Sequence, residues 1–396
     1  MKQLKKYLLG FLVLIGVVFI TGLYAKIDDS TEFRECKNIN EAEKLRELSK
    51  LLPRVEKEEF IEQGLNNDLR PLKKEPVKVK GLYMSGQAFN STQLFSSLVK
   101  LVDETELNAL VIDLKDDLGV LTTDLDVQLA KDLKIRTYRG RDAAENMNIL
   151  LSKNIYPIAR IVVFKDPSLA ENKPELALRR QDGTIWRDRK KLAWVDPHHR
   201  EVWEYAVNIA KEAAKMGFRE IQFDYVRFPS DGNMQDVVYP YADGHKKEDV
   251  IHKFLQFAKK ELEPYNVFLA ADVFGLTTMT LDDMGIGQKF EKIITEVDYV
   301  CPMVYPSHYG PGNYGFANPN AYPYEVVQKA LLDGLEKVGD TPVVIRPWLQ
   351  DFNLGKPAYG STEVRAQIKA AYDVGLEEWF LWNARNKYTD SALLRN

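Results

Sequence analysis

Short apolar segments alternate with longer amphipathic segments from about residue 79 to the end of the chain. Eight short segments are rich in β-branched and aromatic residues, which predicts strands at 79–85, 109–114, 156–164, 220–228, 267–274, 299–305, 342–349 and 378–383. Between them, apolar residues recur at helical spacing, for example over 92–104, 200–216, 247–262, 324–337 and 362–374. This alternation is typical of βα units in a parallel sheet. Eight such units predict a closed (β/α)8 barrel, a TIM barrel.

A doubly wound open sheet is the alternative fold for this pattern. That fold normally carries a glycine-rich phosphate-binding turn after its first strand. Here the corresponding residues are Met84-Ser85-Gly86-Gln87, which do not form that motif. The closed barrel is therefore the fold class that we predict.

The first 27 residues differ from the rest of the chain. Three lysines precede an uncharged and almost wholly apolar run at residues 7–25. The run approaches the ~20 residues that span a bilayer, and residues 23–25 are also compatible with signal-peptide cleavage. We expect a signal sequence or, preferably, a membrane anchor at 1–27. Lysines on its short N-terminal side predict that the remainder lies outside the cytoplasm, at the cell surface.

A charged segment connects this apolar run to the predicted barrel. Residues 28–76 are dense in Glu, Lys, Leu and Asn, and Leu and Ile recur at helical spacing over 42–64. Pro71 and Pro76 mark its end. We expect a helical stalk or linker at 28–76 and the barrel domain at 77–396. A helix packed across the bottom of the barrel is the alternative for the charged segment.

Composition and charge narrow the functional classes. Of the 396 residues 45% are hydrophobic and 28% charged, so the chain is able to bury a large core. The 54 Lys and Arg against 58 Asp and Glu give a net charge of -4, which provides no general attraction to nucleic acid. Cys36 and Cys301 are the only cysteines, so neither a disulfide framework nor a cysteine metal site is expected.

Two carboxylates in apolar strands are the strongest candidates for catalysis. Active sites of (β/α)8 barrels lie at the C-terminal ends of the strands, and Asp224 and Asp272 occupy such positions in the fourth and fifth strands. An unpaired carboxylate is costly to bury. Residues at matching depth on adjacent strands lie about 5 Å apart, close to the carboxyl separation in a retaining glycosidase. We expect Asp224 and Asp272 to be the catalytic pair, with a structural brace to Arg160 or Arg227 as the alternative.

Aromatic and polar residues near the same strand ends predict a carbohydrate site, because sugar rings pack their apolar faces on aromatic rings. Segment 305–316 is rich in Gly, Pro and Tyr. We expect substrate contacts from seven residues at this mouth: Asp116, Arg160, Arg227, Tyr305, His308, Trp348 and Trp382. For Asp116 a solvated acidic turn is an equal alternative. A single histidine such as His308 also fits a metal ligand or an ordinary loop residue.

The same strand ends carry a resemblance to a known family, over segments 111–116, 158–164, 221–229, 271–275 and 302–309. The chain resembles bacterial proteins described as glycosyl hydrolases, whose barrel is distantly similar to the alpha-amylase type. In amylase-like barrels the nucleophile is an Asp that ends the fourth strand, which matches Asp224. Their acid/base is a Glu that ends the fifth strand, where this chain has Asp272. The resemblance implies a domain that cleaves a polysaccharide or glycan.

We therefore predict an extracytoplasmic glycoside hydrolase that needs no cofactor and acts on a cell-wall or other glycan. Asp224 would attack the anomeric carbon, and Asp272 would be proton donor and then base, in a retaining mechanism. Two alternatives stay open. A metal-dependent barrel hydrolase or isomerase would use Asp116, Asp224, Asp272 and His308 as ligands, without the clustered His and Glu of a strong site. A non-catalytic glycan-binding barrel would need the aromatic residues but not the acids.

Overall fold

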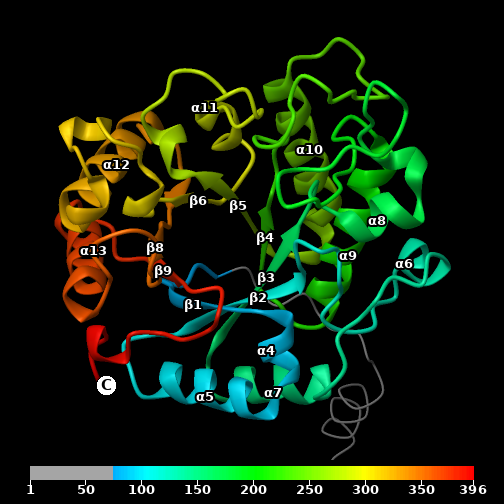
Figure 1. Ribbon diagram of the computed structural model, residues 1–396. Helices are drawn as coiled ribbons and strands as arrows, with labels where there is room; N and C mark the ends of the chain where they lie inside the picture. Colours follow the sequence, from blue (N-terminus) through cyan, green and yellow to red (C-terminus); the bar gives the residue numbers. More distant parts are fainter. Residues whose placement is uncertain (1–74) are drawn as a thin grey trace, which may run out of the picture. The chain divides into compact units, whose positions relative to one another are not determined.

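The computed structural model describes residues 75–396, which form a closed parallel β-barrel surrounded by helices (Figure 1). The strand order is β5-β4-β3-β2-β1-β9-β8-β6-β7, and β5 also pairs with β6, which closes the sheet. All pairings between these strands are parallel. The predicted (β/α)8 barrel is confirmed. The membrane segment predicted at 1–27 and nearly all of the stalk predicted at 28–76 lie outside the described residues.

The strands lie close to the predicted segments, with two informative differences. They are β1 Lys80–Met84, β2 Ala109–Lys115, β3 Tyr156–Val162, β4 Glu220–Asp224, β5 Phe268–Phe274, β6 Tyr299–Met303, β7 Val344–Ile345, β8 Trp348–Gln350 and β9 Trp379–Trp382. The predicted seventh strand is divided into β7 and β8, because Pro347 has no N–H to continue the ladder. The fourth strand ends at Asp224, since the next residue, Tyr225, has a left-handed φ of 47°.

Helices cover the outside of the barrel and bury one apolar face each. The longer ones are α5 Thr92–Asp103, α7 Ala143–Ser152, α9 Arg200–Lys215, α10 Lys247–Leu262, α12 Pro323–Val338 and α13 Ser361–Asp373. The shorter ones are α4 Gly86–Asn90, α6 Gln128–Asp132, α8 Pro167–Asn172 and α11 Phe290–Ile293. Figure 1 shows α12 packed beside α13, and α9 beside α10. Within residues 75–396 no helix combines the length and apolarity needed to cross a membrane.

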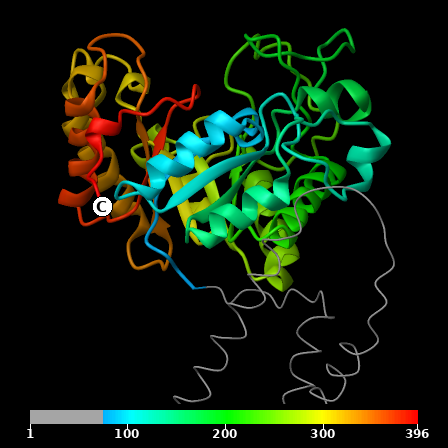
Figure 2. The same cartoon turned by 90° about the horizontal axis from the view of Figure 1, so that it is seen from below.

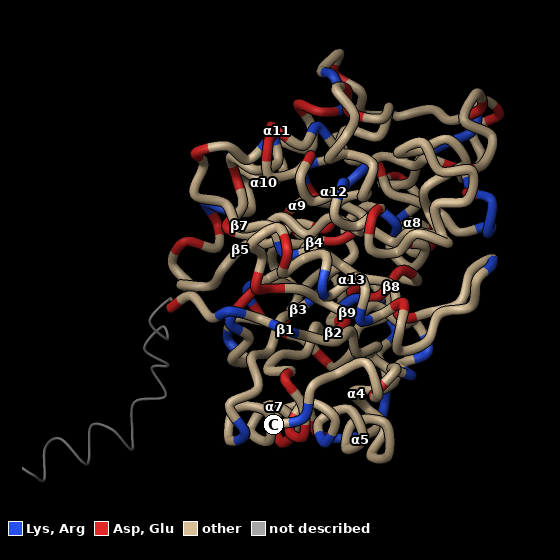
Figure 3. Tube along the Cα trace, turned by 90° about the vertical axis from the view of Figure 1, so that its left-hand side faces the viewer, with Lys and Arg blue, Asp and Glu red and all other residues tan. Residues whose placement is uncertain are grey.

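Seven 3₁₀ turns connect these elements within the described part of the chain: Pro174–Leu176, Glu263–Tyr265, Gly275–Thr278, Pro306–His308, Asn313–Gly315, Pro319–Ala321 and Asp390–Ala392. The last of them packs against α13, where Figure 2 shows the C-terminal segment. Lys and Arg are interspersed with Asp and Glu along the trace in Figure 3. Neither sign of charge is confined to one part of the described trace in that view.

Buried apolar residues form two clusters. The larger one includes residues of both the strands and the helices, such as Ile112 and Phe254, and fills the layer between barrel and helices. The smaller one consists mainly of alternate strand residues, among them Val111, Ala270 and Cys301, and fills the barrel interior. Because side chains alternate along a strand, polar residues in step with the smaller cluster also point into the barrel. The candidate acids belong to this inward-facing set.

Candidate active site

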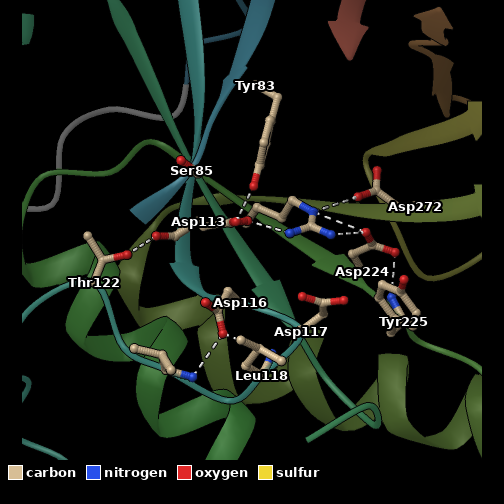
Figure 4. Close-up of polar contacts among 12 residues, drawn as sticks. Tyr83, Ser85, Asp113, Asp116, Asp117, Leu118, Thr122, Asp224, Tyr225 and Asp272 are labelled. Atoms are coloured by element: carbon tan, nitrogen blue, oxygen red, sulfur yellow. Dashed lines mark hydrogen bonds and ion pairs between the residues drawn. The ribbon is translucent and has the colours of Figure 1, made fainter. Parts of the chain in front are cut away.

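One arginine joins three carboxylates at the C-terminal ends of neighbouring strands (Figure 4). Arg160 on β3 donates from Nε to Asp224 Oδ2 on β4 over 3.0 Å and from Nη1 to Asp113 on β2. Asp272 Oδ2 on β5 lies 3.9 Å from Arg160 Nε. The register pairs Phe223 with Ala271, the residues directly before the two predicted catalytic acids. Asp224 and Asp272 therefore lie at the same depth, and both lie near one guanidinium nitrogen, Arg160 Nε.

This cluster is buried and has more acid than base. Asp272 is 1% exposed and Asp224 6%, while Asp113 and Arg160 are also buried. A single cation does not balance three carboxylates, and uncompensated buried charge is costly. Burial raises the pKa of Asp272 well above its usual range, and the charge of Asp224 raises it further. Asp272 is thus the acid that keeps its proton most readily.

Asp224 is held by its neighbours on both carboxylate oxygens. Its Oδ1 accepts the N–H of Tyr225 over 2.5 Å, a contact that the left-handed backbone of Tyr225 makes possible. Its Oδ2 accepts from Nε and Nη2 of Arg160. Both oxygens of the predicted nucleophile are thus fixed by hydrogen bonds, whereas burial raises the pKa of the neighbouring Asp272 and favours its protonated form.

Trp348 positions Asp272. Its indole Nε1 donates to Asp272 Oδ1 over 2.7 Å, and its side chain is fully buried. We expected Trp348 to contact substrate, and its fully buried indole favours a role in positioning Asp272 instead. Its position follows from Pro347, which interrupts the seventh strand immediately before it.

Trp382 and Tyr83 form an aromatic wall beside Arg160. Their rings stack with centroids 4.0 Å apart, and the guanidinium carbon of Arg160 lies 5.1 Å from the ring of Trp382. The Tyr83 hydroxyl donates to Asp113 Oδ2 over 2.5 Å. Trp382 is partly exposed, so it is the predicted aromatic contact that keeps a surface available to a sugar.

Tyr305 and His308 lie on the loop that follows β6. Tyr305 is buried, and burial together with the charges of Asp272 and Asp224 raises its pKa well above its usual range, which places the phenol near both acids. The ring of His308 lies 5.2 Å from that of Tyr305, and desolvation lowers its pKa. The structure thus brings Tyr305 to the acids and leaves His308 on the exposed side of Tyr305.

Asp116 is occupied by its own turn. Its Oδ1 accepts the N–H groups of Leu118 and Val120, both over 2.9 Å, and its Oδ2 accepts the Tyr138 hydroxyl over 2.8 Å. Both carboxylate oxygens are therefore engaged within the protein, which favours the alternative of an acidic turn over a substrate contact. Asp113 was not predicted as a site residue, yet it is one of the three carboxylates around Arg160. The available signal was the strand alternation, because Asp113 lies two residues after the inward-facing Val111.

Arg227 lies beside the cluster without joining it. Its Nη1 donates to the carbonyl of Phe228 over 2.9 Å and to the Ser230 hydroxyl over 3.3 Å. Its guanidinium carbon lies 4.6 Å from the ring centroid of Phe274. Of the two arginines expected to brace Asp224, Arg160 does so and Arg227 does not.

Within residues 75–396 no group of three or more His, Cys, Asp or Glu is placed to hold a metal ion. The three acids that come closest to such a group are Asp113, Asp224 and Asp272, and the guanidinium of Arg160 already lies between them. The carboxylate oxygens of these three acids therefore surround the guanidinium group of Arg160.

Solved structures share this fold. The glycoside hydrolase domain of PgaB from Bordetella bronchiseptica is 13% identical over 78% of this chain and 95% of its own, with a TM-score of 0.58. The alpha-galactosidase TtGalA from Thermus thermophilus is 15% identical over 81% of this chain and 65% of its own, with a TM-score of 0.51. No curated protein sequence matches the chain.

One further solved structure and one family model match the chain. A hypothetical protein from Ruminiclostridium thermocellum is 34% identical over 52% of this chain and 98% of its own, with a TM-score of 0.45. Residues 81–388 match the model of the DUF4015 family, whose description is "Putative glycosyl hydrolase domain". That match includes every strand of the barrel except the first residue of β1. The chain therefore belongs to this family of glycosyl hydrolase domains.

Proposed function

We propose that the barrel is a retaining glycoside hydrolase acting on a polysaccharide or cell-wall glycan, with Asp224 as nucleophile and Asp272 as general acid and base. The observation that carries this proposal is the placement of both acids at Arg160 Nε, at 3.0 Å and 3.9 Å, with the pKa of Asp272 raised by burial and by the charge of Asp224. A predicted nucleophile at the end of β4 also agrees with the alpha-amylase type of barrel.

The proposed reaction has two steps. Asp224 attacks the anomeric carbon while Asp272 gives its proton to the departing glycosidic oxygen, so that one glycan leaves as an alcohol and the other is esterified to Asp224. Asp272, now ionised, then takes a proton from a water molecule, whose oxygen attacks the same carbon and releases Asp224. The enzyme returns to its first protonation state.

The electrostatics of the pair support this exchange of roles. The charge of Asp224 raises the pKa of Asp272 in the resting site. Esterification removes that charge, so the pKa of Asp272 falls in the glycosyl-enzyme and the residue becomes a carboxylate base. Arg160 keeps its hydrogen bond to Asp113 throughout, which holds the guanidinium in place during both steps.

The apolar run at 7–25 and its preceding lysines support a location outside the cytoplasm, with the chain attached to the membrane or secreted. A glycan of the cell surface would be the substrate within reach there. The partly exposed Trp382 offers it an aromatic surface directly beside Arg160.

Reducing-end release by the full-length chain tests the proposal, against peptidoglycan glycan strands and α- and β-linked polysaccharides. Asp224→Asn should fold normally and lose turnover by about 1,000-fold or more, because the nucleophile is gone. Asp116→Asn is the matched control; it keeps the turn and should retain turnover. A fully active Asp224→Asn enzyme would contradict the assignment. Glycan binding by both forms without any product would indicate a binding barrel.

A further inference from the structure

Two buried cations flank the ring of Tyr225 next to the proposed nucleophile. Lys165 Nζ lies 4.7 Å from its centroid, and the guanidinium carbon of Arg227 lies 5.0 Å from it. Lys165 is paired: its Nζ lies 2.9 Å from Asp117 Oδ2 and 4.0 Å from Asp188 Oδ2. Arg227 is 7% exposed and forms no ion pair within 4 Å among residues 75–396. Both cations lie near the ring of Tyr225, but only Lys165 is paired with a carboxylate among residues 75–396.

Two of the nearby acids, Asp188 and Asp117, are already engaged, and Asp224 and Asp231 act on Arg227 from beyond ion-pair distance. Asp188 accepts the N–H groups of Lys190 and Leu192 on Oδ1 and the indole N–H of Trp194 on Oδ2. Asp117 pairs with Lys165. Burial lowers the pKa of Arg227, whereas Tyr225 and the carboxylates of Asp117 and Asp188 raise the pKa of Lys165 despite its burial.

The guanidinium of Arg227 retains donors for a ligand. Both of its hydrogen bonds to described residues use Nη1, and its guanidinium carbon lies 4.6 Å from the ring centroid of Phe274 and 4.9 Å from that of Trp194. Aromatic faces stabilise a cation and fix the plane of the guanidinium. Buried charges are normally paired, and a fixed guanidinium fork matches the two oxygens of a carboxylate. Arg227 therefore has the features of an anion receptor.

The receptor lies at the site of the proposed reaction. Arg227 follows Asp224 by three residues, and its ring partner Phe274 follows Asp272 by two at the end of β5. Asp224 influences the pKa of Arg227 without lying within ion-pair distance. An anionic group bound here would belong to a sugar next to the cleaved bond.

We propose that Arg227 binds a carboxylate on the substrate, so that the glycan is an acidic one. This inference rests on the proposed glycosidase for the location of the sugar. The carboxylate can come from a uronic acid or from the lactyl group of a muramic acid, which share the same chemistry. Neutral glycans would leave the buried guanidinium without its anion and should bind more weakly.

Binding by the full-length chain, measured by calorimetry, tests this with matched ligands. One pair is an oligoglucuronate and the neutral oligosaccharide made from it by carboxyl reduction; the other is a chitooligosaccharide with and without lactyl groups. We expect one acidic ligand to bind at least tenfold more tightly than its neutral partner. Arg227→Met should reduce this preference below threefold, and Arg227→Lys, which keeps the charge but not the fork, should give an intermediate value.

Equal binding of both members in both pairs, or a preference that persists in Arg227→Met, would overturn the inference. A thermal unfolding scan shows whether Arg227→Met folds. If it does not fold, the difference in affinity between acidic and neutral ligands for the wild-type chain still tests the inference. The two proposals fail separately. Acid-selective binding without product would contradict the hydrolase and keep the receptor, whereas hydrolysis of neutral glycans without acid selectivity would keep the hydrolase and remove the receptor.

Discussion

The barrel interior contains two buried arginine clusters built from the same chemical groups. The upper cluster consists of Arg160, Asp113, Asp224 and Asp272 at the C-terminal strand ends. The lower cluster consists of Arg346, Glu220 and Glu378. In the lower cluster Arg346 Nη1 donates to both oxygens of Glu220, over 2.9 and 2.8 Å, and Nε donates to Glu378 over 2.8 Å. Glu220 and Asp224 are the two ends of the same strand, β4.

The two clusters differ in the number of acids and in how closely each acid contacts its arginine. Each acid of the lower cluster has a direct hydrogen bond to arginine. The upper cluster has one acid more, and this acid, Asp272, stays 3.9 Å from the guanidinium and hydrogen-bonds to an indole instead. Burial also raises the pKa of Glu220, but both of its oxygens accept from Arg346, so this cluster holds strands together. Asp272 has a raised pKa and no hydrogen bond to its arginine, which leaves it able to transfer a proton. The comparison therefore separates a structural group from a reactive one.

Removal of the proposed acid should give the largest effect. Asp272→Asn should slow hydrolysis of a polysaccharide by about 100- to 10,000-fold, and that of a nitrophenyl glycoside much less, because nitrophenol leaves without a proton. The ratio of kcat/KM for the two substrates is the measurement. Glu220→Gln is the matched change in the lower cluster, and it should leave this ratio unaltered. An altered ratio in Glu220→Gln alone would reverse the assignment of the two clusters.

Removal of the lower arginine should act on stability. Arg346→Met leaves Glu220 buried without its partner, which should reduce the free energy of unfolding by about 3–5 kcal/mol. Urea unfolding measures this loss, and turnover per folded molecule should stay near the wild-type value. Arg160→Met is the counterpart and should abolish turnover. Normal stability together with lost turnover in Arg346→Met would show that the lower cluster is not merely structural.

The smallest effect concerns Asp113 and pH. Burial, opposed by Arg160, raises the pKa of Asp113 from 3.8 to about 6 in the folded protein. The folded state therefore binds this proton more tightly than the unfolded state does. The resulting stability is complete below about pH 4 and is lost as the pH rises through 6. Asp113→Asn should remove up to roughly 3 kcal/mol of this pH dependence in urea unfolding. Asp116→Asn removes only a lesser contribution to the raised pKa of Asp113 and should retain most of this pH dependence. An unchanged slope in Asp113→Asn would contradict the raised pKa.

The fold was predictable because each strand and helix has its own local periodicity. The exceptions come from single residues. Pro347 divides the seventh strand, and the backbone of Tyr225 ends the fourth one early. Both effects depend on hydrogen bonds to neighbouring strands and on one dihedral angle, which the hydrophobic pattern does not contain. Neither changes the topology.

The sequence predicted which residues lie at the site better than it predicted what each of them contacts. The two acids and Arg160 were expected at one mouth, since parallel strand ends converge there. The burial of Trp348, the turn around Asp116 and the inclusion of Asp113 depend on which way each side chain points beyond its strand. That direction is set by contacts between distant segments, so a single sequence gave no direct measure of it.

The divided seventh strand has a consequence for how this protein can change. Arg346 ends one hydrogen-bonded network and Trp348 begins another, with only Pro347 between them. Loops at the mouth can be exchanged to reach new substrates while the framework stays intact. Residues 346–348 have no such freedom, because one altered side chain there disturbs both the framework and the acid. Engineering of specificity should therefore begin in the loops after β4 and β6 and leave this tripeptide untouched.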